Sequence, residues 1–325
     1  MENARCEQCG SEVNFPVLTA KDRDWGSGDT FSLVKCSRCG LVYVNPRPAE
    51  TEMGKYYPPE NWGRAKNGTA EQDAVINGAH WSVSSAERAA VILPLAGKGS
   101  ILDVGCGDGF FLLYLSRLGW DCHGVEPGET AAAYARETLG LDVRTGTLLT
   151  TRYEEASFDV VSFHHVFEHL REPKATLREV RKLLKAGGYL VVSVPNFDSV
   201  DRKLFGSGWV GLKLPQHLFQ YTSATLRRML EDAGFAFCSV AYRSYEAKST
   251  MYYSESLRYC LRDIGLYPPA PPVNAPTAPP VPASSDWRGV LHFFERGLFK
   301  GIGCVADALH IGSTMTMVMR NVKGL

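Results

Sequence analysis

Four cysteines near the N-terminus are spaced as metal ligands. They form two Cys-x-x-Cys pairs, each followed directly by a glycine: Cys6, Cys9, Cys36 and Cys39. Four thiolates make a closed tetrahedral zinc site, which leaves no open position for catalysis. We therefore predict a structural zinc ion that holds together a module too small to fold alone. The 26 residues between the pairs predict an enlarged loop, and a redox pair or a rubredoxin-like iron site are the alternatives.

A glycine-rich segment later in the chain suits a ligand that contains a ribose. In LDVGCGDG, a hydrophobic run leads into Gly105, Gly107 and Gly109, and the apolar segment FFLLYLSRLG follows at once. Glycines let a ligand approach the backbone, and the start of a helix offers N–H groups to it. Glu126 follows about 20 positions later, at the end of the next predicted strand, where a carboxylate can accept both ribose hydroxyls. The alternative is a tight turn without a ligand.

The acidic residue before the first glycine separates two classes of cofactor. NAD-binding proteins usually lack it, whereas here the pattern is Asp103-Val-Gly-Cys-Gly-Asp-Gly. This pattern resembles the first motif of class I S-adenosylmethionine (SAM)-dependent methyltransferases. The resemblance implies that Asp103 helps to hold the methionine part of SAM and that the three glycines flank it. SAM is therefore the cofactor that we expect.

The resemblance continues over residues 85–243 and the last predicted strand. Three later segments look like parts of one methyltransferase subfamily: SFDVVSFHHVFEHLREP, LLKAGGYLVVSVPN and PQHLFQYTSATLRRMLEDAGF. One departure is the segment VRTGTLLTTRYEE, where the family usually has an acidic or amide residue at the adenine. Thr147, Leu148 and Leu149 cannot supply a carboxylate, which leaves backbone N–H groups for that contact. These motifs indicate the cofactor and not the acceptor.

Histidines are the candidates for a catalytic base. Methyl transfer needs an aligned acceptor and, for a hydroxyl or an acidic carbon, removal of a proton. We favour His217, which follows the fifth strand of the predicted sheet, although it could instead pin its loop by a hydrogen bond. His164 and His165 end the fourth strand; one should face the cofactor, and we expect His165 to line the SAM pocket. Glu168 and His169 could pair to fix the following loop.

Aromatic residues flank the predicted cofactor domain. Tyr56, Tyr57 and Trp62 lie in the lead-in segment, and in similar methyltransferases such tyrosines cover the cofactor. An aromatic ring near a sulfonium also offers cation–π attraction. Packing between domains is the alternative. Trp209 could line the acceptor pocket or pack in the same way.

Short apolar runs alternate with helical patterns between Ser100 and Arg243, which indicates βαβ units and a mostly parallel sheet. We expect strands at ILDV, CHGV, LDVRT, FDVVSF and YLVVSV, with STMTMVMRN as the last strand. Helices are expected at FFLLYLSRLG, ETAAAYARETLG, KATLREVRKLLKAGG and SATLRRMLEDAG, the last three ended by glycine. The fold class is α/β, a Rossmann-like methyltransferase sheet of seven strands with the last antiparallel, preceded by a small zinc ribbon.

The expected domains follow from these motifs. Residues 1–45 form the zinc-binding module, residues 46–98 a connector with a helix around residues 70–93, and residues 99–325 the SAM-dependent methyltransferase domain. An insertion at about residues 245–312 precedes the last strand.

The insertion combines two features. Residues 268–282 hold eight prolines, which suits a linker or a lid and not a helix. A helix at residues 287–309 carries an apolar stripe, which we expect to pack onto the core. The alternative is a peripheral contact with a membrane or a lid over a lipid-like acceptor.

Charge and composition limit the partners. Lys plus Arg equals 35 and Asp plus Glu equals 35, whereas proteins that bind phosphate backbones usually show a basic excess. Residues 1–60 hold seven basic and nine acidic residues, so the zinc module is not basic either. No apolar run is long enough to span a bilayer, and the start lacks the apolar core of a signal peptide. We expect a cytoplasmic protein, with five further cysteines as single thiols.

These features favour a small-molecule C- or O-methyltransferase. A four-cysteine module before a Rossmann-like core resembles sugar C-methyltransferases that act on nucleotide-linked deoxysugars, although their further large C-terminal domain is lacking here. A zinc-containing RNA methyltransferase and a non-catalytic SAM-binding protein are the alternatives. The sequence indicates neither the acceptor nor the oligomeric state.

Overall fold

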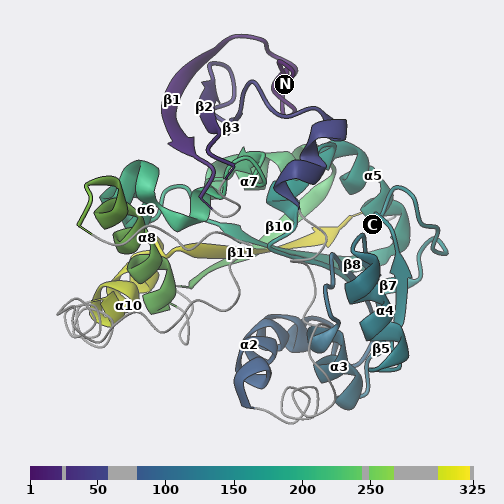
Figure 1. Cartoon of the computed structure of the whole chain (residues 1–325). Coiled ribbons are helices and arrows are strands. Elements are labelled where there is room, and N and C mark those ends of the chain that lie inside the picture. The colour runs from purple at the N-terminus through teal and green to yellow at the C-terminus, as the bar shows by residue number, and fades with distance from the viewer. Residues whose placement is uncertain (24–26, 58–78, 244–248, 267–298, 323–325) are drawn as a thin grey trace. The chain divides into compact units, whose positions relative to one another are not determined.

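The computed structural model describes residues 1–23, 27–57, 79–243, 249–266 and 299–322 (Figure 1). These residues divide into two compact units, each assembled from separate stretches of the chain. The first unit comprises Met1–Tyr56, Pro195–Thr225 and Ala241–Met315, and the second comprises Tyr57–Val194, Leu226–Val240 and Thr316–Leu325. None of the described helices is both long enough and apolar enough to cross a membrane.

A seven-stranded sheet forms the centre of the second unit. Its order is β10-β11-β8-β7-β4-β5-β6, with the last strand of the chain, β11, antiparallel to the others. The bounds are β4 Ser100–Val104, β5 Asp121–Glu126, β6 Asp142–Thr145, β7 Phe158–His164, β8 Leu184–Pro195, β10 Phe235–Arg243 and β11 Thr314–Asn321. Strands β6, β5, β4, β7 and β8 pair in parallel. This order confirms the expected Rossmann-like methyltransferase fold.

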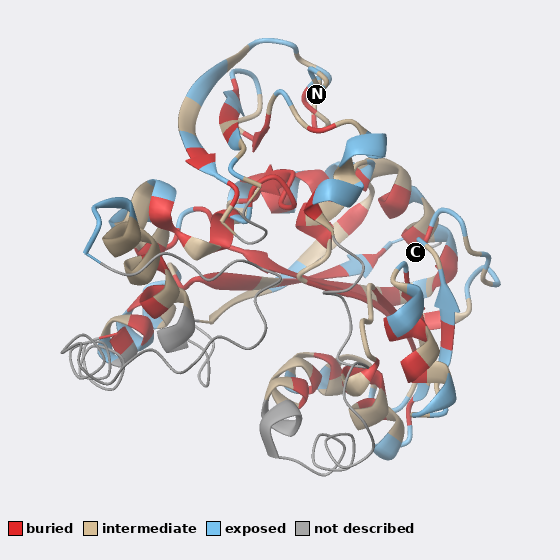
Figure 2. Ribbon diagram, in the orientation of Figure 1, coloured by how far each residue is buried: buried red, intermediate tan, exposed pale blue. Residues whose placement is uncertain are grey.

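Helices cover the sheet and bury its central strands, which are red along most of their length in Figure 2. One core cluster joins α2, α3 and α4 to the sheet through fully buried side chains such as Ile92, Leu112, Ala132 and Val160. The bounds are α2 Ala79–Ala96, α3 Phe110–Arg117, α4 Glu129–Glu137, α5 Pro173–Leu183 and α7 Ser223–Asp232. The alternation of apolar strands with amphipathic helices therefore yields the layers that the sequence predicted.

Two predicted helix boundaries were wrong. The helix expected to run to a terminal glycine ends at Leu183, and β8 begins at Leu184, which pairs with Phe158. Gly188 serves the strand, since a Cβ there would lie 3.1 Å from the Asp159 carbonyl oxygen. Helix α2 continues to Ala96, beyond the predicted end, and the predicted residues 70–78 lie outside the described part of the chain.

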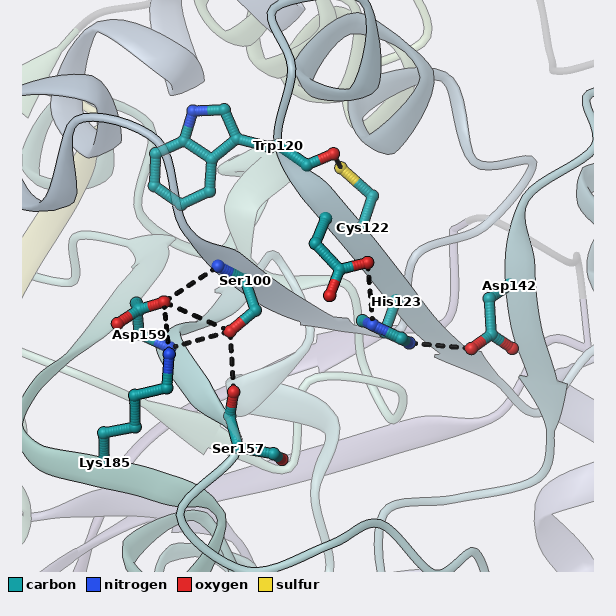
Figure 3. A network of polar contacts seen from close by, with 9 residues as sticks. Ser100, Trp120, Cys122, His123, Asp142, Ser157, Asp159 and Lys185 are labelled. Carbon is teal, nitrogen blue, oxygen red and sulfur yellow. Dashed lines mark hydrogen bonds and ion pairs between the residues drawn. The ribbon is translucent and has the colours of Figure 1, made fainter.

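The amino ends of five strands are tied together by polar side chains (Figure 3). The Asp159 carboxylate accepts the Ser100 backbone N–H at 2.9 Å and the Lys185 ammonium at 2.8 Å. Beside this pair, the His123 ring lies 2.7 Å from Asp142. The network fixes β4, β5, β6, β7 and β8 at the edge opposite to their carboxyl ends.

The first unit holds a separate antiparallel sheet of order β1-β2-β3-β9. Its strands are β1 Asn14–Lys21, β2 Thr30–Cys36, β3 Val42–Val44 and β9 Phe219–Gln220. Strand β9 therefore extends the N-terminal sheet with residues that lie far along the chain. The helices of this unit are η1 Glu50–Tyr56, α6 Val200–Phe205, η4 Gly206–Gly208, η5 Val210–Leu212, α8 Ser249–Asp263 and α10 Lys300–Ala308.

The insertion differs from its prediction. Helix α8 was not expected, and it contacts α10 by stacking Tyr253 on Phe299 with ring centroids 5.3 Å apart. The proline-rich residues 268–282 and the first part of the predicted helix lie outside the described residues. On α10 and just after it, Val305 and Leu309 are 59% and 62% exposed, so this part of the predicted stripe is not buried.

Candidate cofactor and metal sites

The three glycines of the loop after β4 share a backbone conformation but differ in their surroundings. Gly105, Gly107 and Gly109 all have left-handed backbone angles, with φ of 71°, 56° and 81°. A Cβ at Gly105 would lie 2.4 Å from a Val166 methyl group, and one at Gly109 would lie 2.8 Å from Leu141. A Cβ at Gly107 would meet nothing within 4 Å. Packing therefore requires glycine at both ends of the loop, whereas the middle glycine borders open space.

Glu126 at the end of β5 holds this loop in place. Its carboxylate accepts the Gly107 N–H at 3.0 Å and the Gly128 N–H at 2.8 Å, one on each oxygen. Burial raises the pKa of Glu126, and the two N–H groups oppose that rise. A carboxylate oxygen has two lone pairs, so each oxygen can accept a further hydrogen bond from a ligand hydroxyl.

Asp103, near the end of β4, is a buried carboxyl. It accepts a 2.6 Å hydrogen bond from the Ser162 hydroxyl on β7. Burial raises the pKa of Asp103 to about 6, although Ser162 and the Arg88 guanidinium favour its charged form. Sequence reasoning missed both partners. Ser162 could have been noticed as a polar residue within the apolar run FDVVSF. Nothing in the sequence around Arg88 indicated its place near Asp103.

The two histidines that end β7 have different surroundings. His164 is buried and packs edge-on against Phe111, with ring centroids 4.9 Å apart. Burial, Arg88 and His165 hold the pKa of His164 well below its usual range, so this ring is neutral at pH 7. His165 has a left-handed backbone, with φ of 58°, and its Nδ1 lies 3.5 Å from the Glu168 carboxylate.

Tyr57 contacts the loop after β7. Its hydroxyl lies 2.7 Å from Nδ1 of His169, and the two rings meet edge-on. Burial, together with the Glu168 carboxylate, raises the pKa of Tyr57, which keeps the phenol protonated. Glu168 itself is 1% exposed. The structure therefore brings Tyr57, His165, Glu168 and His169 into one polar group within the second unit.

The four N-terminal cysteines converge in the first unit. Their sulfur atoms all lie within 4.8 Å of one another, with Cys6 and Cys39 at 3.4 Å and Cys9 and Cys36 at 3.5 Å. Zinc–sulfur bonds of about 2.3 Å place the sulfurs of a tetrahedral site about 3.8 Å apart. Backbone N–H groups of Gln8 and Cys9 point to the Cys6 sulfur. Such bonds stabilise thiolates, so the donor set fits zinc.

The comparison with known families decides the class of the second unit. Residues 84–240 match the model of a family described as a methyltransferase domain. These residues form a class I SAM-dependent methyltransferase domain. The matched range contains the glycine loop, Glu126 and the end of β7.

Two relatives found by sequence agree with this assignment. The chain is 31% identical over 136 residues to a "Probable S-adenosylmethionine-dependent methyltransferase" of Mycolicibacterium smegmatis, covering 42% of this chain and 51% of that protein. It is 29% identical over 175 residues to a "Ubiquinone biosynthesis O-methyltransferase" of Thiobacillus denitrificans, covering 50% and 75%. The chain thus spans about half the length of the first relative. A solved SAM-dependent methyltransferase from Archaeoglobus fulgidus aligns with 76% of this chain and 97% of its own, at 17% identity and a TM-score of 0.47.

Residues 147–149, just after β6 of the methyltransferase domain, offer no carboxylate. Leu148 is buried and Leu149 is 44% exposed. The Thr147 N–H donates to the Thr150 hydroxyl at 2.9 Å. This N–H is therefore already bonded within its own turn, and the adenine-contacting residue stays unassigned.

His217 and Trp209 belong to the first unit. His217 is buried, and its Nδ1 lies 2.8 Å from the Gly211 carbonyl oxygen. A carbonyl only accepts, so Nδ1 carries the proton and Nε2 of the neutral ring is the basic nitrogen. Trp209 is also buried and donates its indole N–H to Asp201 at 2.7 Å. The predicted Trp62 lies outside the described residues.

Proposed function

We propose that the protein transfers a methyl group from SAM to the carbon or oxygen of a small-molecule acceptor. Nucleotide-linked sugars and natural-product intermediates are the acceptor classes that we favour. The observation that carries the proposal is Glu126, a buried carboxylate anchored by two backbone N–H groups beside the open space at Gly107. Such an anchored carboxylate suits a ribose that presents two hydroxyls.

The chain offers complementary groups for the rest of the cofactor. SAM supplies an electrophilic methyl group on a positively charged sulfur. The Asp103 carboxylate would pair with the methionine ammonium, a charge-assisted contact that is strengthened by burial. Tyr57 and His165 would cover the methyl-bearing end, since the His169 contact holds the Tyr57 ring in one orientation.

His217 is the base that we propose. Its hydrogen bond to Gly211 fixes the tautomer in which Nε2 can take a proton from an acceptor hydroxyl or acidic carbon. The same bond pins the loop, so both roles suggested by the sequence are compatible. His165 is the second candidate, oriented by its backbone and by Glu168.

We further propose that the four-cysteine cluster holds a structural zinc ion. The convergence of the sulfurs and the N–H groups directed at them support this assignment. Four thiolates leave no position for a substrate, so the ion would stabilise the first unit and take no part in methyl transfer.

The equal numbers of basic and acidic residues, 35 each, support a small-molecule acceptor over a nucleic acid. A cytoplasmic location stays a prediction from the sequence. Two relatives named for ubiquinone O-methylation support the inclusion of hydroxyl acceptors. A peripheral membrane contact through the C-terminal helix stays a prediction, which the exposed apolar side chains of Val305 and Leu309 support.

The test is methyl transfer by the zinc-loaded full chain, with methyl-labelled SAM and three acceptor sets: nucleotide sugars, small hydroxyl compounds and structured RNA. We expect label on a small molecule and a loss of kcat of roughly a hundredfold or more in His217→Gln. His310→Asn, at an exposed histidine of the same unit, is the matched control. Label on RNA alone would overturn the proposal, and SAM binding without any transfer would support a non-catalytic protein.

A further inference from the structure

The first unit contains a cleft with three basic side chains. Lys21 at the end of β1, Arg23 just beyond it and Lys213 after η5 line it together with Tyr259 of α8. The cleft is small, with a volume of about 10 Å³, which is room for about one water molecule. This cleft is separate from the cysteine cluster and is not used by the proposed methyl transfer.

One of the three cations is held in place by its neighbours. The Arg23 guanidinium binds the Asp263 carboxylate through two bonds of 3.0 and 2.6 Å and lies over the Tyr259 ring at 5.1 Å. Its side chain is 17% exposed, whereas Asp263 is 41% exposed. Arg23 is therefore fixed in orientation before any ligand arrives, and Asp263 balances its charge.

The two lysines leave a positive excess. Both are exposed, and neither makes an ion pair with any other residue that the structure describes. With Arg23 balanced by Asp263, the cleft keeps two net positive charges among its described lining residues. An anion that binds in the cleft would be attracted by both ammonium groups.

The backbone at Lys213 is also unusual. Its φ of 38° and ψ of 55° lie in the left-handed region, which lysine seldom adopts. The His217 N–H donates to the Lys213 carbonyl oxygen at 2.9 Å and so holds this turn. Strained backbone often occurs where a side chain is aimed at a ligand. Lys213 is exposed and is one of the residues that line the cleft.

We propose that this cleft binds the phosphate groups of a phosphorylated small molecule. Two lysines supply compact charges for phosphate oxygens, and the fixed Arg23 adds a planar donor group. The cleft itself has room for only about one water molecule, so a phosphate group would bind at its open mouth, where the side chains of Lys21 and Lys213 are exposed. This proposal does not depend on the methyl-transfer proposal, because all the residues that line the cleft belong to the first unit.

The test is an isothermal calorimetric titration of the zinc-loaded full chain with inorganic pyrophosphate. Neither SAM nor an acceptor is present. We expect saturable binding at one site that weakens as NaCl is raised. The double variant Lys21→Gln with Lys213→Asn should weaken binding roughly tenfold or more, since it removes both charges while asparagine tolerates the left-handed backbone. Lys203→Gln, an exposed lysine on α6 outside the cleft, should bind as the wild type does.

Two results would overturn the proposal. One is a wild-type protein that shows no saturable pyrophosphate binding, and the other is a cleft variant that loses no more affinity than Lys203→Gln does. S-adenosylhomocysteine binding by the same variants serves as the folding control. Pyrophosphate binding is measured alone, so a failure of methyl transfer would not affect this result. A failure to bind pyrophosphate would likewise leave the methyl-transfer proposal unaffected.

Discussion

At the scale of single residues, Asp103 should control how cofactor binding depends on pH. Burial raises its pKa to about 6, so the group loses its charge as the pH falls through that value. A neutral carboxyl no longer attracts the methionine ammonium. We therefore expect the affinity for S-adenosylhomocysteine to fall below about pH 6, by at most roughly tenfold per pH unit. Calorimetry over a pH series measures this slope.

The matched variant is Asp103→Asn, which keeps the size of the side chain and removes its titration. It should bind more weakly than the wild type at pH 7, and its affinity should show a flatter pH dependence. An identical slope in both proteins would show that another group controls the dependence.

Residue-scale predictions from the sequence succeeded where a spacing motif marks the site. The four cysteines converge as their spacing predicted, and the glycine loop has the left-handed angles that its composition implied. The partners of these residues were harder to find. Ser162 meets Asp103 from 59 positions away, and His169 meets Tyr57 from 112 positions away. Such pairs depend on strand order and on the path of the connector, which a single sequence does not show.

At the scale of elements, the Asp159 network ties the amino ends of neighbouring strands together (Figure 3). The carboxylate bonds to Ser100 on β4 and to Lys185 on β8 while it lies on β7. We expect Asp159→Ala to lower the free energy of unfolding by about 1 to 2 kcal/mol, since the side chain is partly exposed and its ion pair is screened. Urea denaturation measures this, and Glu137→Ala, at an exposed acidic residue on α4, is the control.

The same network has a defined pH dependence. The Asp159 pKa is lowered, because the hydrogen bonds from Lys185 and Ser100 outweigh burial. A lowered pKa means that the carboxylate contributes stability above the unfolded-state pKa of about 3.9, and that this contribution is lost as the pH falls through the folded value. The difference between wild type and Asp159→Ala should therefore shrink below about pH 4. A difference that persists there would mean that packing, and not charge, accounts for the loss.

The sequence predicted element types better than element ends. Every strand expected in the parallel sheet is present, because short apolar runs between amphipathic helices have few other arrangements. The predicted boundary between α5 and β8 was wrong. The glycines that were expected to end the helix lie in β8 instead, where Gly188 allows the backbone of β7 to approach closely. Helix α8 was missed because its sequence, STMYYSESLRYCLRD, is rich in serine and tyrosine, which are weak helix signals.

At the scale of the whole molecule, the zinc ion should contribute to the stability of the first unit. Cys36 ends β2, and β3 of the same sheet pairs with β9 from a distant part of the chain. Loss of the metal should therefore weaken more than the N-terminal segment. We expect Cys36→Ser to lose the zinc measured by elemental analysis and to unfold at a lower temperature.

Cys238→Ser is the control for this prediction, because Cys238 is exposed and lies outside the cluster. It should keep one zinc per chain and the wild-type melting temperature. A purified wild-type chain with iron in place of zinc would favour the rubredoxin-like alternative. Full stability of Cys36→Ser would remove the structural role.

The central claim is that the loop between β4 and α3, held by Glu126, binds SAM. Calorimetric titration with S-adenosylhomocysteine tests it most directly, comparing the wild type with Glu126→Ala and with Glu129→Ala, a 67% exposed neighbour on α4. We predict one site per chain in the wild type and the control, and an affinity lower by roughly tenfold to a hundredfold in Glu126→Ala. A wild-type chain that binds no S-adenosylhomocysteine, or a Glu126→Ala chain that binds it equally well, would contradict the account.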